Sequence, residues 1–268
     1  MQKNILITGA TDGIGFETAK MLLTKGYNVS IHGRNPEKIV RVGKALTEQT
    51  GKRPSESYQA DLANLQDVVA LAAKNQAPLD VLINNAGVFQ TRQSTTANGL
   101  DVRFVVNTIA PYLLTQRLMP KLQDSARIIN VSSAAQTSVD LAAMQTANTL
   151  TANAAYAQSK LAIIMWSNHL AKSLNDKKVI LSVNPGSLLG SKMVKEAYGI
   201  AGGNVAIGGE ILKRTAIAEE FATASGKYFD NDSRQLALPH PDALDADKNA
   251  AVVATIESIL SQNITDKL

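Results

Sequence analysis

The chain has 268 residues, of which 45% are hydrophobic and 19% are charged, and these proportions exclude a disordered or fibrous protein. It has no cysteine, which excludes disulfides and a thiol nucleophile, and with three histidines and no acidic pairs at ligand spacing we expect no metal site. The net charge of +4 comes from lysines and arginines interleaved with acids, so we expect no nucleic-acid partner.

No apolar run approaches the roughly 18 residues of a membrane span, and the N-terminus lacks the core of a signal peptide. We therefore expect a cytoplasmic protein, and we allow for a homo-oligomer. Residues 1–268 are predicted to form one domain, because this length is normal for a doubly wound α/β sheet.

The first 25 residues predict a strand, a glycine-rich turn and a helix. Residues 4–8 are a short apolar run typical of a strand buried on both faces, and residues 14–25 follow as the helix. The glycines between them permit a tight turn and a close backbone approach, so the helix can direct its free amides at a pyrophosphate. The predicted cofactor-binding residues of this turn are Gly9, Thr11, Asp12, Gly13, Ile14 and Gly15.

A second strand at 28–32 leads into Gly33 and Arg34, the position whose side chains discriminate between NAD and NADP. In dinucleotide sites an acid at this point accepts the ribose 2′-hydroxyl of NAD, whereas an arginine suits the 2′-phosphate of NADP. No acid stands here, so NADP(H) is favoured over NAD(H), with Arg34 as the phosphate ligand. A solvated loop arginine is the alternative, and Asp12 would oppose the preference if it faced the phosphate.

Further along, helices are predicted at 36–50 and 65–75, and strands at 55–60 and 79–83. Asp61 and Leu62 follow the third strand and are placed to touch adenine, although Asp61 would equally serve as the cap of the next helix. After the fourth strand, Asn85, Ala86 and Gly87 allow the backbone to approach a nucleotide.

The second half carries the candidate catalytic side chains. It predicts helices at 100–122, 154–174 and 247–261 and strands at 127–131, 179–184 and 227–229. Asn107 lies in an apolar stretch of the first helix, where a satisfied core amide is the plain interpretation. The strand at 127–131 delivers Ser133 to its carboxyl end, where ligands bind in open α/β sheets.

Tyr156 and Lys160 are four residues apart on a predicted helix, so the two side chains project from one face. A phenol has an ordinary pKa of about 10, and a nearby cation favours the phenolate, so Lys160 would make Tyr156 a proton donor and acceptor near neutrality. The same spacing is common on solvated helices, and the neighbouring motifs decide between the two interpretations.

Residues 187–224 are predicted to be a substrate-binding lid, because residues 187–209 are rich in glycine and have no strong period. Residues 234–244 contain two prolines and are predicted to be surface loop. The whole is a single-domain, Rossmann-type doubly wound parallel sheet of about seven strands with helices on both faces.

Four ordered motifs resemble those of the short-chain dehydrogenase/reductase family over nearly the whole chain. They are TGATDGIG at 8–15, NNAG at 84–87, Ser133 with YAQSK at 156–160, and VNPG at 183–186. The resemblance implies that Tyr156 donates the proton and that Ser133 polarises a substrate carbonyl. It implies that Lys160 binds the nicotinamide ribose and lowers the pKa of Tyr156, and that Asn107 holds a water in a proton relay. It also implies cofactor contacts at Pro185, Gly186 and Leu188.

Within the family, residues 98–115 and the SGKYF segment at 225–229 are similar to the retinol-dehydrogenase-like branch. The stretch at 134–155 departs from that branch in composition, and Gly190 and Ser191 replace the usual threonine after the Pro-Gly pair. A wall of Phe89, Met144, Met193 and Tyr198 suggests an apolar substrate, although each could equally be core.

The resemblance therefore implies an NADP(H)-dependent oxidoreductase that acts on a carbonyl or alcohol small molecule. The alternative is a non-catalytic nucleotide-binding sensor on the same scaffold. Such sensors typically lack the Tyr or the Lys, and this chain has both.

Overall fold

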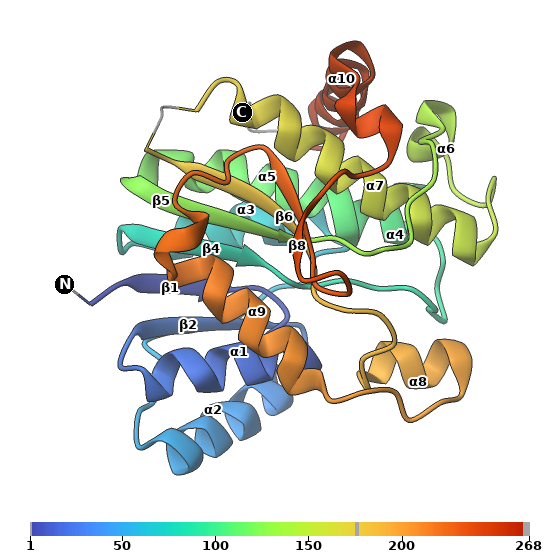
Figure 1. The fold of residues 1–268 in the computed structure, drawn as a ribbon. Coiled ribbons are helices and arrows are strands. Elements are labelled where there is room, and N and C mark those ends of the chain that lie inside the picture. The colour runs from blue at the N-terminus through green and yellow to red at the C-terminus, as the bar shows by residue number, and fades with distance from the viewer. Residues whose placement is uncertain (1, 175–176, 265–268) are drawn as a thin grey trace.

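The computed structural model describes residues 2–174 and 177–264, and within these ranges the chain folds around one eight-stranded sheet (Figure 1). The strand order is β3-β2-β1-β4-β5-β6-β7-β8, and each neighbouring pair is parallel except β7 with β8. The strands are β1 (Asn4–Ile7), β2 (Asn28–Gly33), β3 (Ser57–Gln59), β4 (Leu79–Asn84), β5 (Leu122–Val131), β6 (Val179–Asn184), β7 (Lys227–Asp230) and β8 (Gln235–Ala237). The predicted fold class is confirmed, while residues 1, 175, 176 and 265–268 of the predicted domain lie outside the described residues.

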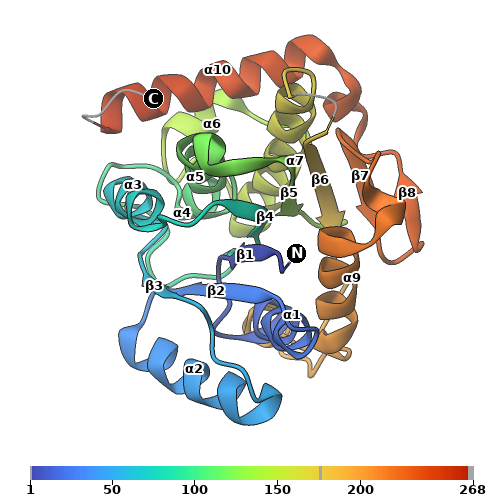
Figure 2. The same cartoon turned by 90° about the vertical axis from the view of Figure 1, so that its left-hand side faces the viewer.

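Helices cover both faces of the sheet, as the view in Figure 2 shows. One face is covered by α1 (Gly13–Thr24), α2 (Pro36–Thr50) and α9 (Val205–Ile217), and the other by α3 (Leu65–Lys74), α5 (Ala110–Leu118), α7 (Ala152–Ala171) and α10 (Ala246–Asn263). No helix in the described ranges combines the length and the apolar character that crossing a membrane requires.

The central strands are buried on both faces because they supply side chains to two separate cores. In β1, Ile5 and Ile7 pack beneath α1, α2 and α9, whereas Leu6 packs into the larger core under α5, α7 and α10. In β4, Leu82 follows Leu6 into that larger core. This explains why the strands appear in the sequence as continuous apolar runs and not as alternating ones.

The strand order reverses between β1 and β4. The chain first builds outward from β1 to β3 and then returns to the other side of β1 with β4. At such a reversal the helices that follow the two strands lie on opposite faces of the sheet, which opens a crevice outside the carboxyl ends of the strands. The turn after β1 and the Asn85–Gly87 segment after β4 flank this crevice.

The helix predicted at 100–122 is interrupted. It consists of α4 (Val102–Phe104), a π-helical turn (Val105–Ile109) and α5, and a final 3₁₀ turn (Met119–Lys121) contains Pro120. In the π turn the amide of Ala110 donates to the carbonyl of Val105, five residues back. The proline ends the helix, so β5 begins at Leu122, five residues earlier than predicted.

The C-terminal third is more regular than predicted. The glycine-rich segment contains α8 (Lys192–Tyr198), which is capped by Ser191 and ends at Gly199 in the left-handed conformation, and then α9. Buried Ile211 and Leu212 fix α9 against the sheet, so a mobile lid would be confined to residues before 205. The predicted loop at 234–244 contains β8, which pairs with the edge of β7 and brings the strand number to eight in the described chain.

Candidate functional site

The glycine-rich turn after β1 packs closely against the loop after β4. Gly9 has φ +64°, and a Cβ there would lie 2.8 Å from the Cα of Ala86. A Cβ on Gly15 would lie 2.4 Å from both the Gly9 carbonyl oxygen and Nδ2 of Asn85. That amide donates to the carbonyls of Thr8 and Gly9, at 2.9 and 3.0 Å. The predicted residues on the two loops are therefore brought together.

Gly13 differs from these glycines because it faces open space. Its φ is +51°, and among the described residues the nearest atom to a Cβ built there is Cβ of Ser191 at 3.5 Å. It is the first residue of α1, and although its own amide donates to Asp12, the next two amides, of Ile14 and Gly15, have no carbonyl partner four residues back in the described chain. The turn thus presents helix amides to the crevice, which is the chemistry of an anion site.

Asp12 is the N-cap of α1 and forms an ion pair. Its Oδ1 accepts a hydrogen bond from the amide of Gly13 at 2.8 Å, and its Oδ2 lies 2.6 Å from Nζ of Lys38 on α2. Burial by itself raises the pKa of Asp12, but the hydrogen bond and charge of Lys38 outweigh it, so the pKa is lowered. The unfavourable charge that the sequence suggested is therefore compensated within the protein.

The predicted cofactor-binding residues that follow β2 and β3 differ in whether their side chains are free to contact a ligand. Arg34 is exposed and makes no hydrogen bond or ion pair with any part of the chain that the structure describes. Leu62 is buried in the core, so its side chain is not available to a ligand. Asp61 accepts from the amide of Ala63, whereas Asn64 caps α3, so the interpretation of Asp61 as that cap is wrong.

His32 was not predicted as a site residue, and it is buried beneath the glycine-rich turn. The amide of Gly9 donates to its Nδ1 at 3.2 Å, and its Nε2 lies 3.1 Å from the carbonyl oxygen of Ala60. Because Nδ1 accepts, the proton is on Nε2 and the ring is neutral. Burial lowers the pKa of His32 and keeps it neutral, although the Ala60 carbonyl and Asp61 oppose this shift.

Tyr156 and Lys160 project from α7 toward the end of β5. The Lys160 ammonium lies 5.8 Å from the centre of the Tyr156 ring and donates to the carbonyl of Val131 at 2.7 Å. The Ser133 hydroxyl faces the Tyr156 phenol closely enough to lower its pKa. The structure therefore brings the three predicted side chains to one point.

The pKa of Tyr156 differs from the expectation. Burial raises it, and the Ser133 hydrogen bond only partly opposes this effect. Burial also lowers the pKa of Lys160 to about 8. The predicted lowering by Lys160 is not found, because the ammonium is directed at the Val131 carbonyl and not at the phenol oxygen.

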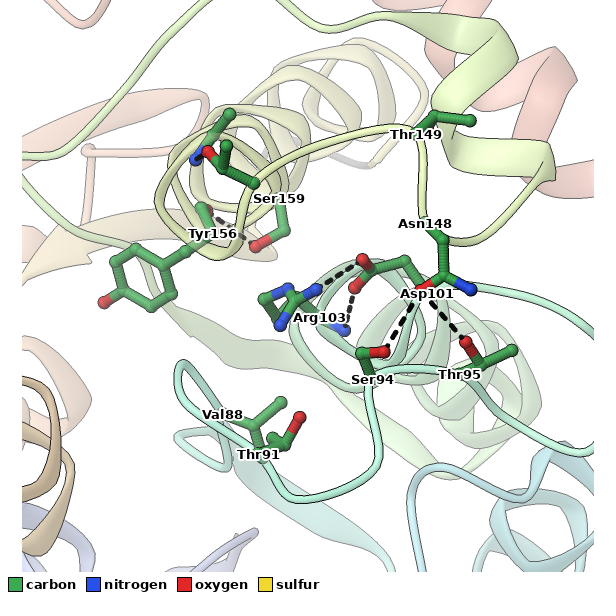
Figure 3. Close-up of polar contacts among 12 residues, drawn as sticks. Val88, Thr91, Ser94, Thr95, Asp101, Arg103, Asn148, Thr149, Tyr156 and Ser159 are labelled. Carbon is green, nitrogen blue, oxygen red and sulfur yellow. Dashed lines mark hydrogen bonds and ion pairs between the residues drawn. The ribbon is translucent and has the colours of Figure 1, made fainter.

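Asn107 is completely buried and all of its polar atoms have partners. Its Oδ1 accepts from the amide of Val88 at 2.8 Å, and its Nδ2 donates to the Val88 carbonyl and to the Ser159 hydroxyl, each at 2.9 Å. Ser159 in turn donates to the carbonyl of Tyr156, as Figure 3 shows. The satisfied-amide interpretation is thus correct, and the amide also ties the loop after β4 to the helix that carries Tyr156.

Aromatic side chains border the Tyr156 phenol. The Phe89 ring centre lies 4.7 Å from that of Tyr156 and 5.9 Å from that of Tyr198 on α8. Met193 reaches 3.8 Å from a Cβ built at Gly87. Three of the four predicted wall residues therefore gather here, whereas Met144 is fully buried in the core.

The loop after β6 is held by the turn that follows β7. Asn231 donates to the carbonyl of Pro185 at 2.9 Å, and Asp232 accepts from the amide of Ser187, also at 2.9 Å. Gly186 has φ +121°, and the exposed Leu188 has φ +51°. These predicted cofactor contacts lie where the chain passes from β6 into α8.

The segment at 134–155 is attached to the loop that follows β4. It contains the short helix α6 (Leu141–Gln145) and Asn148, whose φ is +62°. Oδ1 of Asn148 accepts from the hydroxyls of Ser94 and Thr95 at 3.1 and 3.5 Å (Figure 3). The same figure shows the ion pair between Arg103 and Asp101, which lies next to Ser94. Asn148 therefore ties the segment at 134–155 to the loop that follows β4.

Comparison with known proteins agrees with this geometry. A family model described as short chain dehydrogenase matches residues 3–199. Human retinol dehydrogenase 13 is 33% identical over 267 residues, which cover 91% of this chain and 80% of the relative. The chain belongs to the short chain dehydrogenase family. This confirms the resemblance, including its retinol-dehydrogenase-like branch, and makes the chain an oxidoreductase of that family.

Two further similar proteins extend the comparison. Human polyprenol dehydrogenase is 36% identical over 180 residues, which cover 63% of this chain and 54% of the relative. A short chain dehydrogenase from Shigella flexneri, solved in complex with NADP, is 26% identical with a TM-score of 0.68, and the match covers 86% of this chain and 97% of that one. A nicotinamide cofactor is therefore supported for this oxidoreductase.

Proposed function

We propose that the protein is an NADP(H)-dependent oxidoreductase that interconverts a carbonyl and an alcohol, with Tyr156 as the general acid and base. The observation that carries this proposal is the gathering of Ser133, Tyr156 and Lys160 at the end of β5, where Nζ of Lys160 lies 5.8 Å from the centre of the Tyr156 ring and donates to the Val131 carbonyl, and where the Ser133 hydroxyl faces the Tyr156 phenol. This group lies at the carboxyl ends of the strands, on the same edge as the glycine-rich turn. Nicotinamide, when bound, would supply or accept the hydride.

The residues present fit such a cofactor. The open approach at Gly13 and the first amides of α1 suit a diphosphate, and the unpaired guanidinium of Arg34 suits a 2′-phosphate. The residues that would hold it are Gly9, Thr11, Asp12, Gly13, Ile14, Gly15, Arg34, Asp61, Leu62, Asn85, Ala86, Gly87, Tyr156, Lys160, Pro185, Gly186 and Leu188. NADP in the Shigella relative supports the preference for NADP(H) over NAD(H).

Each catalytic side chain has a distinct part in this proposal. Tyr156 gives its phenol proton to the carbonyl oxygen, and Ser133 donates a hydrogen bond that favours the resulting phenolate. Lys160, with a pKa of about 8, is mostly protonated at neutral pH and adds a positive charge near that phenolate. Asn107 fixes the Val88 loop and the Tyr156 helix relative to each other.

We propose an apolar substrate. Phe89, Met193 and Tyr198 offer aromatic and thioether surface beside the Tyr156 phenol. Retinol and polyprenol, which appear in the names of the two human relatives, are both apolar alcohols. Residues 187–204, with α8, would close over such a molecule.

The test is turnover of a small carbonyl panel by purified protein with NADPH. The panel contains 4-nitrobenzaldehyde, cyclohexanone, decanal and all-trans-retinal, and it is followed through loss of NADPH. Tyr156→Phe should bind NADPH nearly as well as the wild type and lose turnover, because the phenol acts only in the reaction step. Retention by the Phe variant of more than about a tenth of the wild-type kcat would contradict the assignment. Tight NADPH binding without turnover of any panel member would support a sensor instead.

A further inference from the structure

The backbone carbonyl of Ser133 receives two side-chain hydrogen bonds. The Tyr228 hydroxyl donates to it at 3.2 Å, and Nε2 of Gln136 donates to it at 2.9 Å. A carbonyl oxygen has two lone pairs, so these two donors satisfy it completely. Ser133 is the second residue after β5 and lies beyond the last ladder pair with β6, which is Val131 with Val183.

The orientation of this peptide determines where the Ser133 hydroxyl points. The hydroxyl oxygen accepts from the amide of Ala135 at 3.1 Å, which leaves its own proton free to donate to the Tyr156 phenol. A rotation of the Ser133 backbone would move this hydroxyl away from the phenol. The two donors on the carbonyl oppose that rotation.

Tyr228 reaches Ser133 from two strands away. It lies on β7, paired with Ser182 of β6, which in turn pairs with Asn130 of β5. Its side chain is only 5% exposed. Burial raises its pKa, and Asp230 and Asp232 raise it further, so the phenol remains a donor at every working pH.

Gln136 is fixed as well. Its Oε1 accepts from the amide of His240 at 2.9 Å, which directs Nε2 at the Ser133 carbonyl and the neighbouring Tyr228 hydroxyl. Both donors are thus held by other parts of the fold and not by the catalytic segment itself. Tyr228 also belongs to the SGKYF segment, for which the proposed chemistry gives no other role.

We propose that Tyr228 and Gln136 are positioning residues that clamp the Ser133 carbonyl and thereby direct the Ser133 hydroxyl at Tyr156. This inference rests on the proposed function, because it matters only if Ser133 and Tyr156 act on a carbonyl. Neither residue touches the substrate or the cofactor in this proposal.

The test compares Tyr228→Phe, Gln136→Met and the double variant with wild type, using 4-nitrobenzaldehyde and NADPH. Each single variant should lower kcat about two- to fivefold and leave the Kd for NADPH unchanged, since one donor still holds the carbonyl. The double variant should lose more than the product of the two single effects, because both donors share one acceptor. Since the Ser133 hydrogen bond lowers the pKa of Tyr156, the falling limb of the pH-rate profile should also move to higher pH.

The matched control is Tyr58→Phe. Tyr58 is a buried strand tyrosine at the opposite end of the sheet, and its hydroxyl donates to Asn75 at 3.4 Å. It should show a similar small loss of stability with wild-type kcat and pH profile.

The outcomes separate the two proposals. Wild-type kcat and pH profile in the double variant, together with strong loss in Ser133→Ala, would overturn the clamp and leave the proposed function intact. Wild-type turnover by Ser133→Ala and Tyr156→Phe would overturn the function itself. If the double variant does not fold, the two single variants test the clamp. A falling limb of the pH-rate profile that stays at the wild-type pH in both of them would contradict it.

Discussion

Nζ of Lys38 lies 2.6 Å from Oδ2 of Asp12, and this contact joins the second helix to the cap of the first. Asp12 would otherwise place an uncompensated negative charge on the glycine-rich turn. With Lys38 beside it the pair is neutral, and for an NADP(H) bound as proposed the charge of Arg34 would then face the 2′-phosphate without opposition from Asp12. The pair therefore bears directly on cofactor choice.

Lys38→Gln should weaken NADPH binding about three- to tenfold and NADH binding less, because the freed Asp12 charge repels the extra phosphate. Adding Asp12→Asn to this variant should restore most of the NADPH affinity. Fluorescence titration of both nucleotides measures the effect, and Lys44→Gln, an exposed lysine on the same helix, is the control. An equal loss for NADPH and NADH would show that the pair is only structural.

Arg34→Gln should reduce NADPH affinity about ten- to a hundredfold, the range expected for charge-assisted hydrogen bonds, and leave NADH affinity nearly unchanged. The difference should shrink as salt rises, since ions screen a phosphate contact. Arg41→Gln, exposed on α2, is the matched control. Tighter binding of NADH than of NADPH by the wild type, at both low and moderate salt, would contradict the proposed preference for NADP(H).

Substitution of Gly33 by aspartate is not a suitable test of the preference for NADP(H) over NAD(H). A carboxylate there would be expected to favour NADH, but a Cβ on Gly33 would lie 2.5 Å from Cγ2 of Thr11 and 3.0 Å from Cγ1 of Ile39. Gly33→Asp would therefore displace the glycine-rich turn as well as change the charge. Arg34 is exposed and can be changed without such a clash.

The sequence predicted those parts of the site that depend on local pattern. The glycine-rich turn, Ser133 and the Tyr156 and Lys160 pair each lie at a strand end or on one helix face, and strand ends are visible as apolar runs followed by small or polar residues. Because parallel strands align their carboxyl ends, placing the glycine-rich turn and Ser133 at the ends of their strands was sufficient to bring these two parts to one edge of the sheet.

Contacts between distant segments were not predictable in this way. Lys38 on α2 pairs with Asp12 at the start of α1, and Tyr228 on β7 donates to Ser133, which follows β5. Neither contact produces a periodic pattern in the sequence. The strand β8 was missed because three residues at a sheet edge carry no alternation. The pKa of Tyr156 was mispredicted for a related reason, since the direction of the Lys160 ammonium depends on the end of β5.

Lys160→Met should stabilise the protein without bound cofactor at neutral pH, although it should abolish turnover. Burial lowers the pKa of Lys160 from 10.5 to about 8, which corresponds to a penalty of about 3 kcal/mol for holding the charged form in the native state. Below pH 8 the penalty is fully present, and it is relieved as pH rises toward 10.5 because only the native state then releases its proton. Urea unfolding of wild type and Lys160→Met at pH 7 and pH 9.5 measures the difference in their free energies of unfolding.

The gain in the Lys160→Met variant should thus shrink at the higher pH. Lys20→Met, on the partly exposed surface of α1, controls for the change of side chain. A variant that is less stable than wild type at pH 7 would show that the bond from Lys160 to the Val131 carbonyl outweighs the burial penalty.

The last prediction concerns His32, whose neutral ring joins the Gly9 amide to the Ala60 carbonyl. Protonation would place an N–H on Nδ1 opposite the Gly9 N–H, so the turn should loosen. Because the pKa of His32 is lowered in the native state, the unfolded chain binds more protons below about pH 6.5, and the free energy of unfolding should fall as pH drops through that range. Affinity for NADH should fall over the same range, and NADH is the better probe because it lacks the 2′-phosphate, which itself titrates there.

His32→Asn keeps an acceptor near the Gly9 amide without a titrating group, so it should flatten both pH dependences while binding NADH at pH 7.5 to a comparable extent. The matched control is His169→Asn, a histidine in the last turn of α7 on the other face of the sheet, which should retain the wild-type dependence. The measurements are urea unfolding and fluorescence titration between pH 5 and pH 7.5. An unchanged slope in His32→Asn would place the acid sensitivity in another group and leave the ring with a purely structural role.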